Sequence, residues 1–280
     1  MNFVHLAATY EPEIEMGAGL ESTTQVITTL IIVLALAVTV IVTQFIRRRK
    51  EAFPMRAIPA YESIPLLIGE AIEAGRPMHV SFGSAGLGGS NTALTLASAE
   101  LLYQVASRNQ VGSTVVTVSD ASALPLAYGT LRRAYSSRRD RLSSSSVRWY
   151  PGGTRSLAFA AALTGMQGDE RVSGNVLVGN FGPELALVLE SAIRKRQSTI
   201  AGSTDLDGQA VAYAMADHPL IGEELFVAGA YMSDSATQRG SVVTLDVLRW
   251  LLIAGILLAT ANTIREPVLA ALSKLLSGGK

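Results

Sequence analysis

The stretch MHVSFGSAGLGGSNT, residues 78–92, decides the predicted fold. It starts with a short β-like run, MHVSF, and passes through a glycine-rich turn into NTALTLASAELLYQVASRN (91–109), which has the apolar spacing of a helix. A short strand followed by a tight turn and a helix is the first part of a βαβ unit. The domain built around this stretch is therefore expected to be of the α/β class.

The same alternation of strand and helix patterns continues as far as residue 233. The further β-like runs are STVVTVSD (113–120), VRWYP (147–151), GNVLVGN (174–180), STIAGSTD (198–205) and a final run, EELFVAGAYMS (223–233). They are short and nearly continuously apolar, as expected for parallel strands buried on both faces. We therefore predict a Rossmann-like, mostly parallel sheet with helices on both faces, connected by right-handed crossovers, in a domain spanning residues 77–240.

Composition excludes several classes of protein. The 280 residues include 23 basic and 23 acidic side chains, and this balance argues against a nucleic-acid-binding protein, which carries a basic excess. The chain has no cysteine, which excludes a disulfide framework, a thiolate zinc site and a cysteine nucleophile.

Residues 26–46, VITTLIIVLALAVTVIVTQFI, contain no charged side chain. About 20 apolar residues are long enough to cross the hydrocarbon core of a bilayer as a helix. The threonines do not prevent this, because a hydroxyl can bond back to a carbonyl of its own helix. The basic cluster Arg47, Arg48, Arg49 and Lys50 follows the apolar run, whereas a signal peptide has its basic residues first. We predict a retained transmembrane helix with a basic collar at the membrane surface.

Charges on the two sides of this helix set the expected topology. Residues 1–25 contain four glutamates and neither Lys nor Arg, while the other flank is basic. By the positive-inside rule, the acidic tail lies outside the cell and the α/β domain lies in the cytoplasm. Residues 47–76 are expected to form the collar, a linker and a short helix from about Ser63 to Ala74.

A second candidate transmembrane helix covers residues 245–264, LDVLRWLLIAGILLATANTI. Trp250 suits the membrane interface, and Asp246 and Arg249, three residues apart, can face each other near the cytoplasmic end. The alternative is a core helix of the α/β domain. Residues 265–280 have apolar residues on one helical face, which is typical of a helix on a membrane surface or packed on a neighbour. The expected protein is thus a two-pass protein of the cell membrane.

Small and polar residues collect where the predicted strands end. In open α/β sheets the ligand crevice lies at the carboxyl ends of the strands, and amides at a helix N-terminus favour an anion. The candidate ligand-binding residues are Gly83, Ser84, Gly86, Gly88, Gly89, Ser90, Asn91 and, after the second strand, Asp120. The spacing matches neither the dinucleotide fingerprint nor a phosphate loop. In the alternative interpretation the glycines only turn the chain and Ser90 or Asn91 caps the helix.

Few residues suggest catalysis. Of the three histidines, His5 lies in the outer tail, His79 falls inside the first strand and is expected to be buried, and His218 has only acidic sequence neighbours. Asp205 and Asp207 could form a carboxylate pair, although helix capping explains them better. We predict no catalytic residue and no metal site, and leave the cofactor open. The arginine-rich segment 132–141 could contact anionic head groups or form a solvated helix face.

Several motifs carry a resemblance to a known family. They are AYESIPLLIGEAIEAGRPMHVSFGSAGLGG, VTVSD, WYPGG and HPLIGEELFVAGAYMS, followed by the closing hydrophobic helix, and LIGEELFVAGAY (220–231) is the most specific. Over about residues 58–264 the chain resembles an uncharacterised prokaryotic family of membrane proteins, known only as a domain of unknown function. The resemblance implies a Rossmann-like domain beside transmembrane helices and transfers no activity.

The function expected from these features is a membrane-tethered, non-enzymatic scaffold or accessory subunit of a membrane assembly that self-associates. The alternative is a protein or enzyme that binds a nucleotide-type or anionic ligand with the glycine-rich turn. A third possibility is an organiser of anionic lipid that acts through Arg47–Lys50 and the arginine-rich segment 132–141.

Overall fold

The computed structural model describes residues 56–109, 112–136, 146–152 and 157–233, and helical positions at 25–26, 29–34, 36–38, 40–41, 44, 246–247, 249–257 and 260. The chain divides into two compact units. One is Pro54–Gln238, and the other consists of the flanking parts Met1–Phe53 and Arg239–Lys280.

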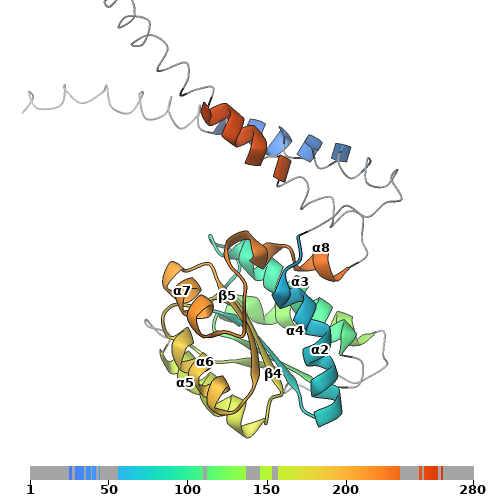
Figure 1. The fold of residues 1–280 in the computed structure, drawn as a ribbon, viewed down its shortest axis with the longest axis vertical. Coiled ribbons are helices and arrows are strands. Elements are labelled where there is room, and N and C mark those ends of the chain that lie inside the picture. Colours follow the sequence, from blue (N-terminus) through green and yellow to red (C-terminus); the bar gives the residue numbers. More distant parts are fainter. Residues whose placement is uncertain are drawn as a thin grey trace, which may run out of the picture. The chain divides into compact units, whose positions relative to one another are not determined.

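A six-stranded parallel sheet forms the centre of the Pro54–Gln238 unit (Figure 1). Its strand order is β3-β2-β1-β4-β5-β6, the order of doubly wound nucleotide-binding folds, so the α/β class and the parallel sheet are confirmed. The strands are β1 (Met78–Gly83), β2 (Thr114–Val118), β3 (Val147–Trp149), β4 (Gly174–Asn180), β5 (Ser198–Ser203) and β6 (His218–Pro219).

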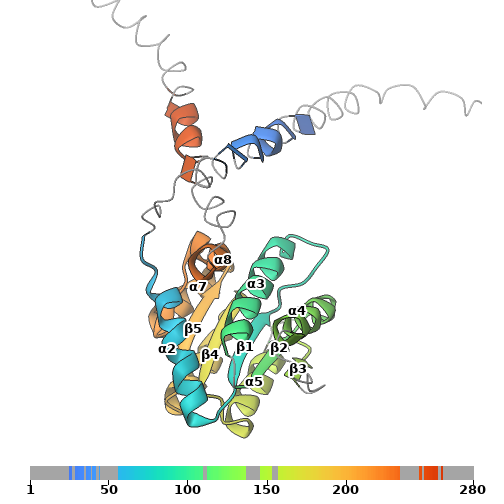
Figure 2. The ribbon, with the colours of Figure 1, turned by 90° about the vertical axis from the view of Figure 1, so that its right-hand side faces the viewer.

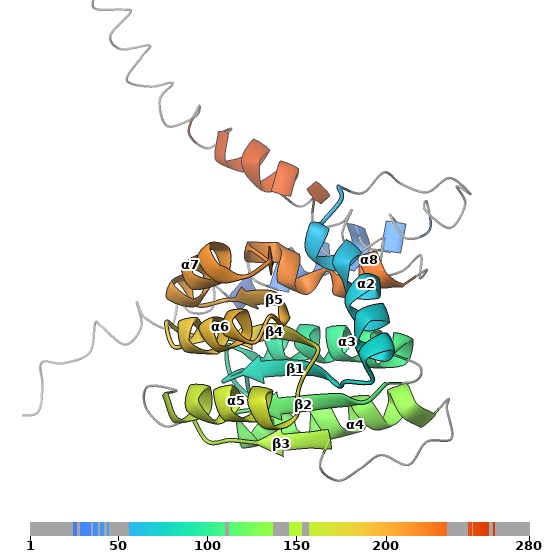
Figure 3. The same ribbon diagram turned by 60° about the horizontal axis from the view of Figure 1, so that its bottom comes forward.

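Helices cover both faces of the sheet (Figures 1 and 3). One face carries α2 (Pro59–Ala74), α3 (Thr92–Arg108) and α4 (Leu124–Ser136), and the other carries α5 (Leu157–Asp169), α6 (Leu185–Arg194) and α7 (Leu206–Met215). Successive side chains of a strand point to opposite faces, so every inner strand needs apolar residues on both sides. Phe159 of α5 packs with Phe181 at the end of β4, in a buried cluster that includes Leu177 of β4.

The segment expected as a linker is part of α2. The helix begins at Pro59 rather than near Ser63, because proline fits the first turn, where its missing N–H is not needed. The side chains of Tyr61, Ile64 and Leu67 are buried, and α2 contacts α3 and β4. This helix therefore belongs to the sheet domain, as its position beside α3 in Figure 2 shows.

The final β-like run, residues 223–233, was predicted wrongly. It forms a 3₁₀ turn, η3 (Gly222–Phe226), and a short helix, α8 (Ala228–Met232), and the sixth strand is the two-residue β6 before it. Ala228, Gly229 and Ala230 have little strand propensity, and these small residues are buried where α8 packs on α3. Local helical packing thus overrides the apolar pattern.

The described positions of the flanking unit are helical. Thr29 Oγ1 donates to the carbonyl of Gln25 at 2.8 Å, the bond expected of a threonine in an apolar helix, and Asp246 lies 3.9 Å from Arg249. Among the positions that the structure describes, no helix is both long and apolar enough to cross a membrane. The acidic tail up to residue 24, the collar Arg47–Lys50, residues 137–145 and the tail 265–280 lie outside the described residues.

Candidate functional site

The carboxyl ends of β1 and β4 mark the point where the strand order reverses. The helices that follow these two neighbouring strands, α3 and α6, cover opposite faces of the sheet (Figure 3). In doubly wound folds this divergence opens the crevice that binds ligand. Of the predicted ligand-binding residues, Gly83 ends β1, six lie in the turn between β1 and α3, and Asp120 follows the adjacent strand β2.

The end of β1 is bonded directly to the end of β4. Ser84 donates to the carbonyl of Asn180 from its backbone N–H at 2.8 Å and from Oγ at 2.9 Å, and Asn180 Nδ2 donates back to Ser84 Oγ at 3.0 Å. Gly83 has φ +60°, and a Cβ there would lie 2.3 Å from the carbonyl oxygen of Asn180. Only glycine lets the two strands approach this closely.

The turns after β1 and β2 are also held together. One oxygen of Asp120 accepts from the N–H of Ser122 at 2.8 Å and caps the 3₁₀ turn η1 (Ala121–Ala123), while Ser122 Oγ accepts from Leu87 N–H at 2.7 Å. The other Asp120 oxygen lies 2.4 Å from where a Cβ on Gly86 would be. A Cβ on Gly86 would therefore displace the side chain of Asp120, whose exposed carboxylate lies beside the glycine-rich turn.

Thr92 binds the exposed tip of the turn. Its Oγ1 accepts from the N–H groups of Gly88 and Gly89 at 3.0 and 3.1 Å and donates to the carbonyl of Gly89 at 2.7 Å. Asn91, at the N-cap position of α3, makes no side-chain capping bond. The hydroxyl of Thr92 thus takes the place where a ligand oxygen would be held, and a ligand would have to displace it.

Sequence analysis located this turn but missed two of its partners. Asn180 ends β4 and Ser122 lies in η1 after β2, and their contacts depend on a strand order that the sequence does not state. An indirect signal existed, since Asn180 ends one predicted strand and Ser122 follows another. Of the candidate residues, Gly83 and Ser84 bond to neighbouring strand ends, through Ser119 N–H and the Asn180 carbonyl, and Asp120 bonds locally to Ser122, whereas Ser90 lies on the exposed loop.

The other polar residues considered for catalysis have structural positions. Asp205 is the N-cap of α7, and its carboxylate accepts from the backbone N–H of Asp207 at 3.0 Å, so Asp205 caps the helix, as expected. His218 is half-buried in β6. In the part of the chain that the structure describes, no group of three His, Asp or Glu side chains could hold a metal ion.

His79 lies in a buried polar network beneath α5. Its Nδ1 bonds Asn175 Oδ1 at 2.9 Å and its Nε2 bonds Thr117 Oγ1 at 2.8 Å. A carbonyl oxygen can only accept, so Nδ1 carries the proton and Thr117 donates to Nε2. Gln167 donates to Asn175 Oδ1, and Asn175 donates to Gln197. In the neutral imidazole both ring nitrogens have hydrogen-bond partners. His79 is therefore a buried core residue, as its position in the strand predicted.

Burial lowers the pKa of His79 from 6.5 to about 4. The bond to Asn175 opposes this shift, and the positive charge of Arg148 adds to it. The side chain is therefore neutral in the folded protein at neutral pH.

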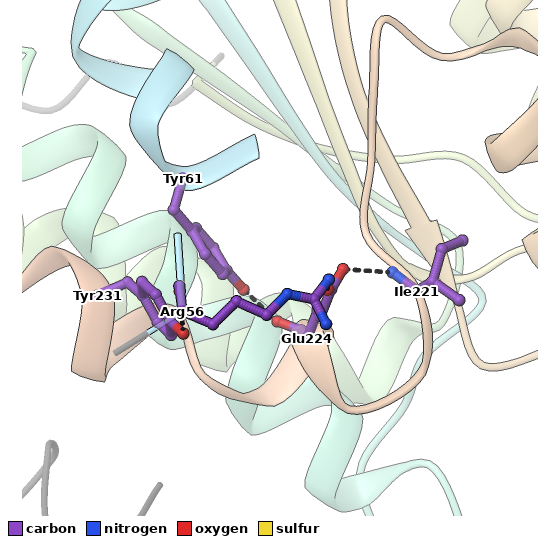
Figure 4. A network of polar contacts seen from close by, with 5 residues as sticks. All are labelled: Arg56, Tyr61, Ile221, Glu224 and Tyr231. Carbon is purple, nitrogen blue, oxygen red and sulfur yellow. Dashed lines mark hydrogen bonds and ion pairs between the residues drawn. The ribbon is translucent and has the colours of Figure 1, made fainter. Parts of the chain in front are cut away.

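A second polar cluster joins the first and last parts of the sheet domain (Figure 4). We call Arg56, Tyr61, Ile221, Glu224 and Tyr231 the Tyr61 cluster. The hydroxyl of Tyr61 donates to the Glu224 carbonyl, and the Glu224 carboxylate accepts from Arg56 at 3.1 Å and from Ile221 N–H at 3.2 Å. Tyr231 stacks on Tyr61 with ring centroids 5.6 Å apart and donates to the Arg56 carbonyl at 2.7 Å.

This cluster unites two motifs that lie far apart in the sequence. Tyr61 belongs to AYESIP and Glu224 to LIGEELFVAGAY, which together carry the family resemblance. Burial, assisted by Glu224, raises the pKa of Tyr61, so its hydroxyl stays a neutral donor. The cluster joins the start of the sheet domain, at Arg56, to its end, at Tyr231.

Comparison with protein families agrees with these motifs. A family described as Domain of unknown function (DUF6754) matches residues 20–272. The chain belongs to this DUF6754 family. The matched region contains the sheet domain and also both apolar stretches, 26–46 and 245–264. No curated protein and no solved structure matches the chain.

We predict that His79 makes stability fall with acid. Above pH 6.5 the imidazole is neutral in both states; as the pH falls from 6.5 towards 4, the unfolded chain binds a proton that the folded chain does not. The free energy of unfolding should drop by about 3 kcal/mol across this window because of His79 alone. Chemical denaturation of the native protein and His79→Gln at pH 7 and pH 4 measures the difference.

His218→Gln is the control for losing a histidine as such and should retain the native decline. A decline equally steep in His79→Gln would contradict the assignment.

We predict that the buried hydroxyl of the Tyr61 cluster contributes more to stability than the outer one. Tyr61→Phe leaves the partly buried Glu224 carbonyl without its donor and should lower the free energy of unfolding by about 1–2 kcal/mol. Tyr231→Phe removes a bond nearer to solvent and should cost less. Denaturation of both variants, each of which keeps the ring stack, gives the comparison; equal losses would argue against the cluster as drawn.

Proposed function

We propose that this DUF6754 protein is a membrane-tethered scaffold or accessory subunit of a membrane assembly, non-enzymatic and self-associating. Residues 26–46 and 245–264 span the cell membrane, the N-terminus lies outside, and the sheet domain lies in the cytoplasm. The collar Arg47–Lys50 lies at the cytoplasmic membrane surface.

The apolar surface of the flanking helical segments carries the proposal. Exposed apolar area costs about 25 cal/mol per Å² in water, so surfaces of this kind must be covered. Among the described positions of the N-terminal segment, eight large apolar side chains are each more than half exposed: Val26, Leu30, Ile31, Ile32, Val33, Leu36, Val40 and Ile41. In the C-terminal segment Trp250, Leu252, Ile256 and Leu257 are exposed to the same degree. A bilayer is the environment that suits such side chains on every side of a helix.

The Tyr61 cluster supports a double tether. It holds Arg56, near the domain's entry, against Tyr231, near its exit. Both connections to the apolar segments therefore leave the sheet domain from neighbouring positions. A domain closed in this way can be held by two anchors in one membrane without strain on its core.

The contacts at the crevice support a structural role. The glycine amides are bonded by Thr92, the strand ends are bonded by Ser84 and Asn180, and Asp120 caps η1. These polar groups stabilise the turn itself. Their presence is therefore explained by the fold without a bound substrate.

Tethering is tested by topology and extraction. The chain has no cysteine, so single cysteines are unique labels. Glu70→Cys, on the exposed side of α2, should react with a membrane-impermeant maleimide only after permeabilisation, whereas Glu13→Cys should react in intact cells. The native protein should stay in the membrane during a carbonate wash.

Release by carbonate, or labelling of Glu70→Cys from outside, would overturn the tether. Light scattering of the detergent-extracted protein should give more than one copy per particle, and a monomer at all concentrations would remove the self-association.

A nucleotide-type ligand is the second candidate function, favoured by the position of Asp120 over Gly86. An acidic residue after the second strand, beside the glycine-rich turn that follows the first strand, is where doubly wound folds bind a ribose. Such a ligand would replace Thr92 at the amides of Gly88 and Gly89.

Thermal unfolding with nucleotides and dinucleotides tests this candidate. A ligand at 100 times its dissociation constant should add roughly 2.7 kcal/mol of stability. Asp120→Asn should reduce the shift, while Asp207→Asn, at an exposed helix start, should not. If no nucleotide shifts the native protein, this candidate fails.

A further inference from the structure

The outer face of α7 carries the two large apolar side chains with the highest exposed fractions in the described part of the sheet domain. Leu206 is 79% exposed and Tyr213 is 73% exposed, more than any other large apolar side chain in the described part of residues 56–233. They lie seven residues apart, so they share one side of the helix, and Ala210 lies exposed between them. A contiguous apolar strip of this kind on a helix surface is typical of an interface.

The composition of α7 supports this interpretation. Its sequence, LDGQAVAYAM, has one charged residue, Asp207, although a surface helix normally carries a polar outer side. Its inner side, at Gly208 and Ala212, is already buried against the domain. The helix is therefore apolar on both its inner and its outer side, as expected of a helix that packs against the domain on one side and against a partner on the other.

The order of side chains along the strip fits a second copy of the same chain. Two α7 helices crossing antiparallel at Ala210 would place Leu206 of each against Tyr213 of the other, and the small Ala210 side chains would let the backbones approach. A twofold interface must be complementary to itself, and a large–small–large order about its centre satisfies that condition.

Charge also favours an antiparallel pair. Asp207 lies exposed in the first turn of α7, and Arg196 lies exposed in the turn that follows α6. Since α6 and α7 follow neighbouring parallel strands and pack side by side, the Arg196 turn and the C-terminal end of α7 lie towards the same edge of the sheet (Figure 3). Antiparallel pairing would bring Asp207 of one copy towards Arg196 of the other, with the helix dipoles also opposed.

We propose that two copies of this chain associate through α7, antiparallel about Ala210, with Leu206 and Tyr213 as the apolar contacts. The α7 interface is the surface through which the self-association in the proposed function would occur, and the inference rests on that proposed function.

Cysteine cross-linking in native membranes tests the contact in the full chain. The protein lacks cysteine, so Ala210→Cys adds one thiol at the crossing point. Disulfides form only where Cα atoms come within about 7 Å, so mild oxidation should convert most of this variant to a species of twice the mass on a non-reducing gel. Leu96→Cys is the matched control: it lies on α3, on the opposite face of the sheet, is 53% exposed, and should stay monomeric.

A second substitution distinguishes a cross-link formed at a stable interface from one formed by random collision. Leu206→Glu in the Ala210→Cys background should abolish the cross-link, and in the otherwise native chain should halve the particle mass measured by light scattering. Leu206 is exposed, so its replacement should leave the melting temperature of the domain unchanged.

The outcomes distinguish the two proposals. A native oligomer in which Ala210→Cys does not cross-link, or cross-links no faster than Leu96→Cys, overturns the α7 interface and leaves self-association standing. A native monomer without cross-link removes both. A cross-link to a different protein overturns the second copy as the occupant.

Discussion

The close approach of β1 and β4 is the constraint on which the rest of the sheet domain depends. A Cβ on Gly179 would lie 1.9 Å from the carbonyl oxygen of Phe82, and one on Gly83 would lie 2.3 Å from that of Asn180. The pairing shifts register between Ser81 and Gly83, just where the strands come together. Because the two following helices diverge from this point, the glycines determine both the closure of the strand ends and the position of the turn that the sequence marks as a ligand site.

Hydrogen bonds between polar groups join separate parts of the sheet domain, although the buried Gln167 Oε1 has no hydrogen-bond partner among the described residues. At the crevice, hydroxyls of Ser84, Thr92 and Ser122 take up backbone groups of the turns, and beneath α5 the neutral ring of His79 bridges two strands through Thr117 and Asn175. Buried polar groups of this kind fix a register, since a shifted strand would leave them unpaired. At the tip of the glycine-rich turn, the amides of Gly88 and Gly89 are already bonded to Thr92.

The sequence was sufficient for the elements that depend on local pattern. The five longer strands and their helices lie where short apolar runs and helical spacing indicated, and the burial of His79 followed from its place within a strand. The sequence was insufficient where contacts with residues distant in the chain determine the local structure. Residues 223–233 have a strand-like apolar pattern but pack as η3 and α8 on α3, and the extent of α2 depends on the sheet beneath it. The partners Asn180 and Ser122 were signalled only by their places at the ends of predicted strands, because which strand ends adjoin is a property of strand order and not of spacing along the chain.

The Tyr61 cluster has a consequence for how such a protein could arise. Its contacts bring residues 56 and 231 together, so the whole sheet domain begins and ends at one place. Domains whose termini adjoin are tolerated as inserts in a host chain, because the host need not separate its own segments to admit them. The adjoining ends of the α/β domain would therefore let it be inserted between two chain segments, or removed from between them, without changing the order of those segments.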